Sequence, residues 1–462
     1  MSPFLIKTIQ LILSLSILIV IHEFGHLLFA KWSKTRVESF YLFFNPGFSL
    51  FRMKRIGGKM EFSFLSKNPP EHWKDYPETT MWGIGWVPLG GYCSIAGMID
   101  ETKDAGDLAA EPQPWEFRTK SAAWRLLIMA GGVLFNFILA LLLYTAILNI
   151  YGETYLPAHE VTMGMSYAPV AQEMGFRDGD ILWAADGVDI ERYDENALRR
   201  MAEARVVTVR RDGDLVDLNM PDDFMQRLMA ARQGFAGYRY PTVVDRVEPS
   251  SPGALAGLMP GDSLVAVQGI AAPAFDEFSA LLRSYADSTV CVTLYRDGEE
   301  KNLTAALDST GRLGFYAKSW TQIYRLSSVH YNVFEAIPAG IKRGVATLKG
   351  YVGDFKYLFT KEGAQNLGGF GSIGGLFPSV WHWESFWETT AFLSIILAFM
   401  NILPIPGLDG GHILFLLVEV VTRRKPSDKF LERAQTVGLI ILLLLLVYAN
   451  GNDLIRWISG KF

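Results

Sequence analysis

The feature that most limits what this chain can fold into is an apolar run of spanning length that carries two histidines and a glutamate. The run covers residues 4 to about 32 and contains the segment IVIHEFGHLLFA. It predicts a membrane-spanning helix, because a backbone in lipid must satisfy its own hydrogen bonds. In a helix, His22 and His26 lie on one face and can both point at one ion, with Glu23 beside them to act on water. Ionisable side chains are costly within an apolar span, so the pattern favours a zinc site over two helix-surface histidines.

Three further apolar regions account for the excess of hydrophobic residues in the composition. They cover residues 124–152, residues 386–421 and residues 434 to about 458. These lengths predict a polytopic α-helical membrane protein with four transmembrane helices. The net charge of -5 argues against nucleic acid as a partner and leaves the lipid bilayer as the expected environment.

The HExxH motif requires a third protein ligand from elsewhere, since two histidines leave a catalytic zinc ion short of the usual three. The third apolar region is interrupted by NILPIPGLDGGHILF, in which Asp409 is the only acid. The prolines and glycines there predict a break in the helix, and zinc would remove the cost of a carboxylate at that depth. We therefore predict Asp409 as the third ligand, with His412 as a rival. Asn401 could hydrogen-bond the substrate backbone.

Two segments after the first span have the pattern of β-strands rather than of helices. Polar and aromatic residues alternate on either side of Gly57 and Gly58 within residues 36–65, which predicts a β-hairpin. Residues 85–98 are again short, apolar and punctuated by glycine. Strands next to a spanning helix cannot leave unpaired edges in lipid, so we expect membrane-associated β-hairpin segments that could hold a substrate extended. A simple cytoplasmic hairpin is the alternative.

The second span carries a polar residue one turn after a pair of glycines. Gly131 and Gly132 allow close helix approach, and Asn136 is an amide inside the span that requires a partner. Two interpretations stay open at this point. Asn136 could make a helix-helix hydrogen bond, or it could bind substrate.

The region from residue 153 to about residue 313 reads as soluble and contains an internal repeat. GFRDGDIL recurs as GLMPGDSL, and VTVRRDG recurs as VTLYRDG. The order of helix, Gly-Asp turn, strand and Arg-Asp-Gly hairpin resembles the bacterial PDZ domain, which binds extended peptides by strand addition. We therefore expect two tandem extracytoplasmic PDZ domains over residues 153–235 and 236–318, which gate or filter by size and could bind peptides.

The remaining segments complete a predicted division into five parts. Residues 1–152 form the N-terminal half of the membrane core, and residues 386–462 form the C-terminal half. Between the PDZ pair and the C-terminal half, residues 319–385 form a connector. It contains a basic amphipathic helix over residues 334–359, expected to lie at a membrane surface or to pack on a partner, and the glycine-rich NLGGFGSIGG.

Together, HEFGH, the second-span asparagine, the tandem PDZ-like repeat and NILPIPGLDGG resemble the site-2 protease family, specifically its bacterial regulator of sigma-E protease type. The resemblance covers nearly the whole chain. It implies one zinc ion per chain, held by His22, His26 and Asp409, with Glu23 as the catalytic base.

The same resemblance implies roles for two asparagines and a class of substrate. Asn401 matches the family motif Asn-x-x-Pro-x-x-x-x-Asp-Gly, and Asn136 matches Gly-x-x-x-Asn, so both are expected to bind substrate. Where the family often has proline after the glycine of the second motif, this chain has Val133. The implied activity is an intramembrane zinc metalloendopeptidase. Its substrates are single-pass membrane proteins already trimmed by another protease, such as an anti-sigma factor, or remnant signal peptides.

The predicted location is a bacterial inner membrane. Basic residues gather between positions 423 and 433, and this loop is expected to stay cytoplasmic. Four spans then place the PDZ pair in the periplasm and the zinc site in the membrane toward the cytoplasmic side. Two alternatives remain. The first is a catalytically silent PDZ membrane scaffold, which would lack one or more of the zinc-binding residues. The second is a membrane zinc protease of another family, which would use a glutamate as its third ligand.

Overall fold

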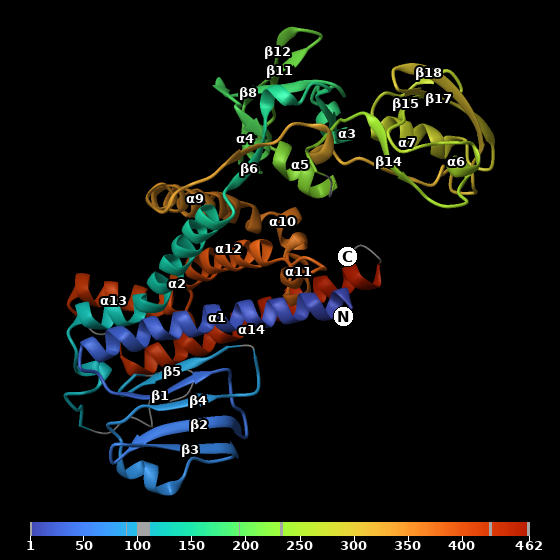
Figure 1. The fold of residues 1–462 in the computed structure, drawn as a ribbon. Helices are drawn as coiled ribbons and strands as arrows, with labels where there is room; N and C mark the ends of the chain where they lie inside the picture. The colour runs from blue at the N-terminus through green and yellow to red at the C-terminus, as the bar shows by residue number, and fades with distance from the viewer. Residues whose placement is uncertain are drawn as a thin grey trace. The chain divides into compact units, whose positions relative to one another are not determined.

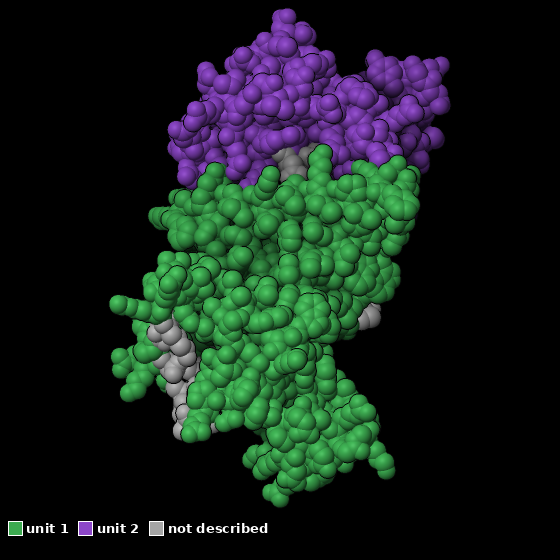
Figure 2. Space-filling view, turned by 90° about the vertical axis from the view of Figure 1, so that its left-hand side faces the viewer, with its two compact units in different colours: residues 1–152, 330–462 green, residues 153–329 purple. Residues whose placement is uncertain are grey.

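The computed structural model describes residues 2–88, 90–98, 111–193, 195–231, 234–424 and 427–459. The chain forms two compact units, drawn in green and purple in Figure 2. The first unit joins residues 1–152 to residues 330–462, and the second unit comprises residues 153–329. All the predicted metal ligands belong to the first unit.

Four helices of the described residues are long and apolar enough to cross a membrane, as the sequence predicted. They are α1 (Pro3–Trp32), α2 (Ala122–Ile150), α12 (Trp383–Ile402) and α14 (Asp428–Ile458) (Figure 1). Ser2, Ser121 and Ser427 precede three of them, and each side chain accepts a hydrogen bond from a backbone N–H of the first turn. These serines satisfy donors that a helix start would otherwise leave unpaired.

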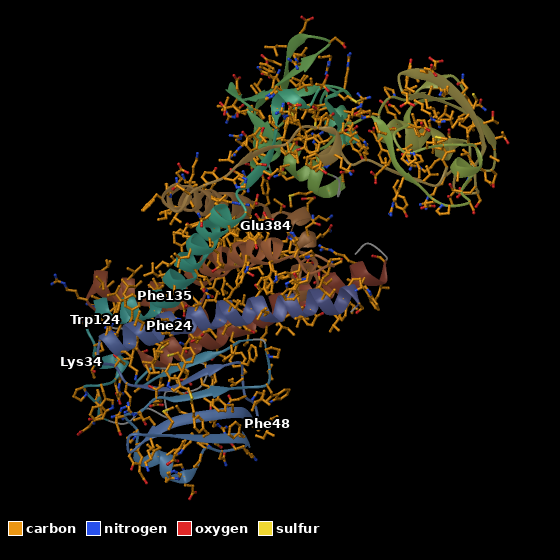
Figure 3. The ribbon with its side chains drawn as sticks, viewed as in Figure 1. Phe24, Lys34, Phe48, Trp124, Phe135 and Glu384 are labelled. Atoms are coloured by element: carbon orange, nitrogen blue, oxygen red, sulfur yellow. The ribbon has the colours of Figure 1, made fainter. Side chains whose placement is uncertain are left out.

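Helices α1 and α2 approach each other closely because glycines face each other at their contact. A Cβ atom on Gly131 would lie 2.6 Å from the carbonyl oxygen of Gly25, so a larger residue does not fit there. Beside this contact, the rings of Phe24 and Phe135 meet edge to face with their centroids 5.8 Å apart (Figure 3). The contact brings the helix with the HExxH motif directly against α2.

The third apolar region is two helices rather than one, as its prolines predicted. Helix α12 ends at Ile402, and α13 (Asp409–Thr422) begins after a short turn. Pro404 and Pro406 lie in that turn, where the missing N–H and the fixed ring prevent a continuous helix. Gly407 has a φ of 92°, a left-handed conformation that favours glycine. The break places Asp409 in the first turn of α13.

A five-stranded sheet follows α1 in the chain. Its strands are β1 (Val37–Leu42), β2 (Ser49–Ile56), β3 (Lys59–Ser66), β4 (Met81–Ile84) and β5 (Tyr92–Ile95). They are ordered β3-β2-β4-β1-β5, with β1 and β4 parallel and the other neighbours antiparallel. The predicted hairpin is confirmed, because Ile56 pairs with Lys59 across Gly57 and Gly58, which both have positive φ. The edge strands are β3 and β5, and β5 packs against α1 (Figure 1).

The second unit consists of two lobes, each with its own apolar core. The elements of the first lobe are β6 (Glu153–Pro157), β7 (Met165–Tyr167), α3 (Pro169–Gln172), β8 (Ile181–Ala185), β9 (Val188–Asp189), β10 (Arg192–Tyr193), α4 (Glu195–Glu203), β11 (Val206–Arg211), β12 (Asp214–Asn219), α5 (Phe224–Ala231) and β13 (Ala236–Tyr238). Those of the second lobe are β14 (Thr242–Val247), α6 (Pro252–Leu255), β15 (Ser263–Val267), β16 (Ile270–Ala271), α7 (Phe275–Ser284), β17 (Thr289–Arg296), β18 (Glu299–Ala306) and β19 (Phe315–Ala317).

The internal repeat has the same ion pair in both lobes. In the first lobe, Arg211 Nη2 donates to Asp180 Oδ2 at 2.6 Å, and in the second, Arg296 Nε donates to Asp262 Oδ1 at 2.7 Å. Each pair joins the aspartate of the Gly-Asp turn to the arginine of the Arg-Asp-Gly hairpin. Burial alone would raise the pKa of Asp262, but hydrogen bonds from Arg296 and from the Met259 N–H hold that pKa below its usual value. The repeated residues therefore build the lobes.

After the second lobe, the chain returns to the first. Helix α8 (Trp320–Ile323) and Tyr324 pack in the core of the first lobe, and β20 (Ser327–Val329) pairs with β6. Just before the second lobe in the sequence, β13 pairs with β7 of the first lobe. The packing of the first lobe thus extends beyond residue 235 and takes in residues after 318, where the sequence suggested boundaries.

The connector contains the expected helix, which packs on the membrane helix α2. Its helices are α9 (Val333–Asp354), α10 (Lys361–Asn366) and α11 (Phe370–Gly375). Helix α9 packs on α2, and its buried residues are the small Ala336, Gly340 and Gly344. Ile337 and Ile341 on the same helix are exposed.

Candidate metal centre

Helix α1 places both histidines of the HExxH motif on one buried face. His22 and His26 lie one helical turn apart, and their Nε2 atoms are 3.2 Å from each other. Their rings meet edge to face, with the centroids 4.9 Å apart. The predicted helical spacing therefore points both imidazoles at one place.

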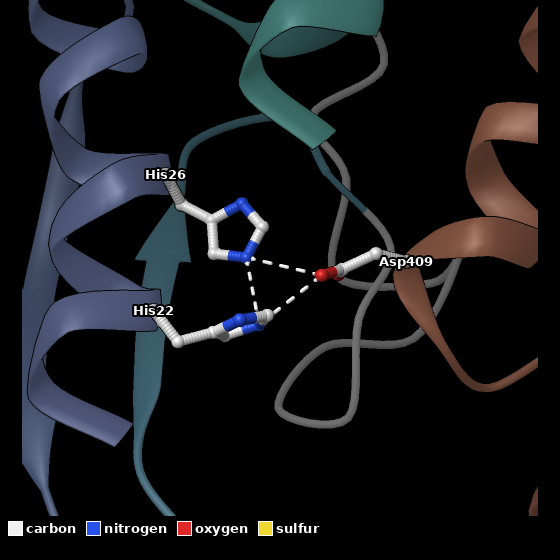
Figure 4. Close-up of side chains that lie close together, drawn as sticks. All are labelled: His22, His26 and Asp409. Carbon is white, nitrogen blue, oxygen red and sulfur yellow. Dashed lines mark hydrogen bonds and ion pairs between the residues drawn. The ribbon is translucent and has the colours of Figure 1, made fainter. Parts of the chain in front are cut away.

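Helix α13 brings the third side chain to that place from the other end of the sequence. Asp409 Oδ2 lies 3.1 Å from His22 Nε2 and 3.4 Å from His26 Nε2 (Figure 4). A tetrahedral zinc ion with ligand bonds of about 2.0–2.2 Å holds its ligand atoms about 3.3–3.5 Å from one another. The three atoms already form a triangle of nearly the size that zinc requires. We call His22, His26 and Asp409 the ligand triangle.

The environment of Asp409 Oδ2 also fits a metal ion. The atom is buried within ion-pair distance of both imidazoles, yet within the described part of the chain it accepts no hydrogen bond. A buried carboxylate oxygen without hydrogen bonds is costly, and a cation bound by the ligand triangle would remove that cost. Two imidazoles and one carboxylate are also a usual donor set for catalytic zinc, which keeps its fourth position open.

Glu23 lies beside the ligand triangle on the same helix. Its carboxylate interacts with the charges of all three ligand residues and accepts a hydrogen bond from the backbone N–H of Cys93. Cys93 belongs to the edge strand β5, so this contact joins the sheet to the HExxH helix. A carboxylate beside the ligand triangle, and not part of it, is well placed to take a proton from water.

Helix α2 contacts both imidazoles through residues spaced four apart. His26 Nδ1 donates to the carbonyl oxygen of Ile128 at 2.8 Å, and the side-chain amide of Asn136 lies 3.2 Å from His22 Nδ1. Between them, Gly132 makes room, because a Cβ atom there would lie 2.5 Å from both His22 Cε1 and His26 Nε2. Sequence reasoning missed Ile128 and Gly132 as parts of the site. The sequence signal that could have found them is that Ile128, Gly132 and Asn136 are spaced four apart on α2, like the two histidines on α1.

The other predicted residues do not join the ligand triangle. Asn401 is half-buried in the last turn of α12, and no hydrogen bond among the described residues connects it to the three ligands. The rival ligand His412 has its Nε2 2.7 Å from the side-chain nitrogen of Gln435 on α14, and it is not among the converging ligand atoms. Asn136 is fully buried, so it presents no surface to a substrate in this structure. The packing favours a role for Asn136 inside the protein.

Comparisons with known proteins identify a family of metallopeptidases. The sequence profile of peptidase family M50 matches residues 10–67 and 69–445. A Vibrio cholerae protein whose name contains the words zinc metalloprotease is 26% identical over 99% of this chain and 100% of its own length. The regulator of sigma-E protease RseP of Escherichia coli is 27% identical over 99% of this chain and 100% of its own length. Positions 22, 26 and 409 lie within the residues that the family profile matches.

Proposed function

Because this chain belongs to peptidase family M50, the site-2 protease family of zinc metalloproteases, we propose a specific reaction for it. It hydrolyses a peptide bond inside the membrane-spanning segment of a single-pass protein that another protease has already shortened. Anti-sigma factors and remnant signal peptides are substrates of this kind. The observation that carries the proposal is the ligand triangle itself, with Glu23 beside it, on helices apolar enough to span a membrane.

In this proposal, His22, His26 and Asp409 hold the zinc ion. Zinc supplies a Lewis acid that acidifies water and polarises the scissile carbonyl. Glu23 accepts the proton from the attacking water and delivers it to the leaving amine. Asn401 donates a hydrogen bond to the substrate backbone.

The edge strand β5 presents the substrate. A peptide bond within a helix is shielded by the hydrogen bonds of that helix, so the substrate must unwind before it is cut. Strand β5 pairs with β1 on one side, and its Cys93 N–H reaches Glu23 on the other. A substrate that adds to this edge is held extended beside the ligand triangle. Residues 48–65, which we expected to share this task, lie mainly in β2 and β3, on the far side of β4 and β1 from β5.

Strand β3 contributes membrane association instead. Met60, Phe62 and Phe64 alternate along this strand and are exposed, with Phe64 at 67%. An exposed apolar row on an edge strand is a hazard in water. At the membrane boundary, lipid can cover the apolar side chains while the unpaired backbone of the edge stays hydrated. The hairpin of β2 and β3 therefore dips into the membrane boundary.

The two lobes of the second unit are PDZ domains that exclude partners with bulky outer domains. The lobes repeat one order of strands and helices and the ion pairs Asp180–Arg211 and Asp262–Arg296. The basic residues between positions 423 and 433 fix that loop in the cytoplasm. The chain then lies in a bacterial inner membrane with the lobes in the periplasm and the zinc site toward the cytoplasmic side.

The test is cleavage of a single-pass membrane substrate with a trimmed outer domain, in liposomes with controlled zinc. The intact protein should cut inside the spanning segment, whereas Glu23→Gln should bind zinc normally and cut nothing. Asp409→Ala should lose both zinc and activity. His412→Ala is the matched control, and it should keep its zinc. Normal zinc binding by Asp409→Ala would overturn the ligand assignment, and cleavage by Glu23→Gln would overturn the role of the base.

A further inference from the structure

One face of α2 carries three groups that meet the histidines of α1. Ile128, Gly132 and Asn136 follow one another at intervals of four residues, so they line one face of the helix. The carbonyl of Ile128 can only accept a hydrogen bond, so His26 Nδ1 must carry the proton in that contact. The Nε2 atom of His26 is then left with its lone pair toward the ligand triangle.

His22 requires the same arrangement, and among the described residues Asn136 is the one in position to provide it. His22 Nε2 faces the ligand triangle, so its Nδ1 must be the protonated nitrogen when Nε2 binds a metal. The atom near His22 Nδ1, at 3.2 Å, is the Nδ2 nitrogen of the Asn136 amide, which cannot accept a hydrogen bond. The Oδ1 atom of that amide is buried and, among the described residues, has no hydrogen-bond partner. Half a turn of the amide brings this oxygen to His22 Nδ1.

We propose that Asn136 is a positioning residue for the metal centre. Its Oδ1 accepts a hydrogen bond from His22 Nδ1 and holds that imidazole with Nε2 toward the zinc ion. This inference rests on the proposed role of His22 as a ligand. Ligating histidines depend on such partners for their tautomer and orientation, and loss of the partner typically weakens metal binding by about 10–100-fold.

The rival explanation is that Asn136 only connects two helices, but the hydrogen bond between α2 and α12 at this residue uses its backbone carbonyl and not its side chain. Ser394 Oγ on α12 donates to the backbone carbonyl oxygen of Asn136 at 2.7 Å. Any residue at position 136 presents this carbonyl, so the helix-helix hydrogen bond does not require an asparagine. The side chain itself is fully buried and directed at His22, which leaves the imidazole as its partner.

The experiment measures the zinc affinity of the full-length protein in detergent, by competition with a chelator. Asn136→Leu keeps the size and removes the acceptor, so it should bind zinc about 10–100-fold more weakly. Asn136→Asp keeps an acceptor at the same place and should bind zinc at least as tightly as the unmodified protein. Ser394→Ala is the matched control, because it removes only the helix-helix hydrogen bond, and its zinc affinity should not change. Cobalt substitution adds a spectroscopic readout, since the ligand-field bands should shift in Asn136→Leu and not in Ser394→Ala.

Several outcomes would overturn the inference. Asn136→Leu with unchanged zinc affinity and an unchanged cobalt spectrum would do so, and so would Asn136→Asp with affinity reduced by about tenfold or more. The second result decides the question even if the leucine variant does not fold. His22→Ala separates this inference from the proposed function. If His22→Ala keeps its zinc, the ligand assignment is wrong, whereas loss of zinc there with normal binding in Asn136→Leu removes only the positioning role.

Discussion

Replacing Gly132 by alanine should remove the zinc ion without unfolding the protein. The added Cβ would lie 2.5 Å from His22 Cε1 and from His26 Nε2, whereas ordinary contacts of a Cβ begin at 3.4 Å. Each imidazole edge must therefore retreat by about 0.9 Å, the difference between these two distances. Ligand distances in a metal site tolerate only about 0.2 Å.

The size of the effect follows from this mismatch. A displacement several times larger than the tolerance acts on two of the three ligands at once. We expect a loss of about 100-fold or more in zinc affinity, which corresponds to about 2.8 kcal/mol. The fold should survive, because the obstructing atoms belong to side chains that can turn aside. In addition, alanine is more favourable than glycine in a helix interior by about 1 kcal/mol.

The assay compares zinc affinity with the melting temperature of the zinc-free protein. Gly451→Ala provides the matched control, because it makes the same change within α14 at a position where a Cβ meets no atom within 4 Å. It should keep both normal zinc affinity and normal activity. If Gly132→Ala binds zinc like the control, then α2 does not confine the imidazoles, and the reasoning fails. If the zinc-free form of Gly132→Ala is also strongly destabilised, the added Cβ shifts the helix backbone rather than the two imidazole rings.

Three further predictions concern the supports of the site and of the lobes. Arg125 Nη2 lies 2.6 Å from Glu419 Oε1, and the guanidinium is largely buried. Glu419→Gln leaves that charge without its partner and should lower the free energy of unfolding, measured by thermal unfolding, by about 3 kcal/mol. Arg125→Met combined with Glu419→Leu should recover most of this loss. Gly438→Ala would drive a Cβ into the backbone of the turn before α13, so zinc affinity should fall while Gly451→Ala again leaves it unchanged. The pKa of Asp262 is lowered by folding, so the stability from its pair with Arg296 is present above about pH 4 and is lost as pH falls further. Hydrogen exchange of β15 and β17 should report that loss below about pH 4, and the Asp262→Asn protein should lack this pH dependence.

The sequence predicted those parts of the site that depend on local patterns. Residues four apart lie on one face of any helix, and the structure places the Nε2 atoms of His22 and His26 3.2 Å from each other. Asp409 was identifiable because a lone acid follows two prolines in an apolar region, and the structure breaks the helix there and places Asp409 beside both histidines. The hairpin was predictable because Gly57 and Gly58 are a local turn signal between two alternating segments.

The contacts that the sequence did not predict are long-range or involve backbone atoms. The carbonyl of Ile128 has no sequence signature, because every residue has one. The pairing of β20 with β6 joins segments on either side of the entire second lobe, and no local pattern specifies it. The small residues through which α9 packs on α2 were not identified from the sequence either. Burying apolar side chains between helices gains little when the alternative is lipid, so small residues such as Gly340 and Gly344 form the contact.

Helix α2 supplies none of the three predicted ligands, yet it packs against both helices that carry them, α1 and α13. It fits against α1 at Gly132 and pairs Arg125 with Glu419 of α13. The two halves of the metal centre lie at opposite ends of the sequence, so their relative position depends on an element that both halves contact. Since the ligand triangle tolerates errors of only about 0.2 Å, that element must be rigid and closely packed. The glycines, the buried Asn136 amide and the largely buried Arg125 of α2 meet this requirement, so we expect α2 to set the geometry of the metal centre.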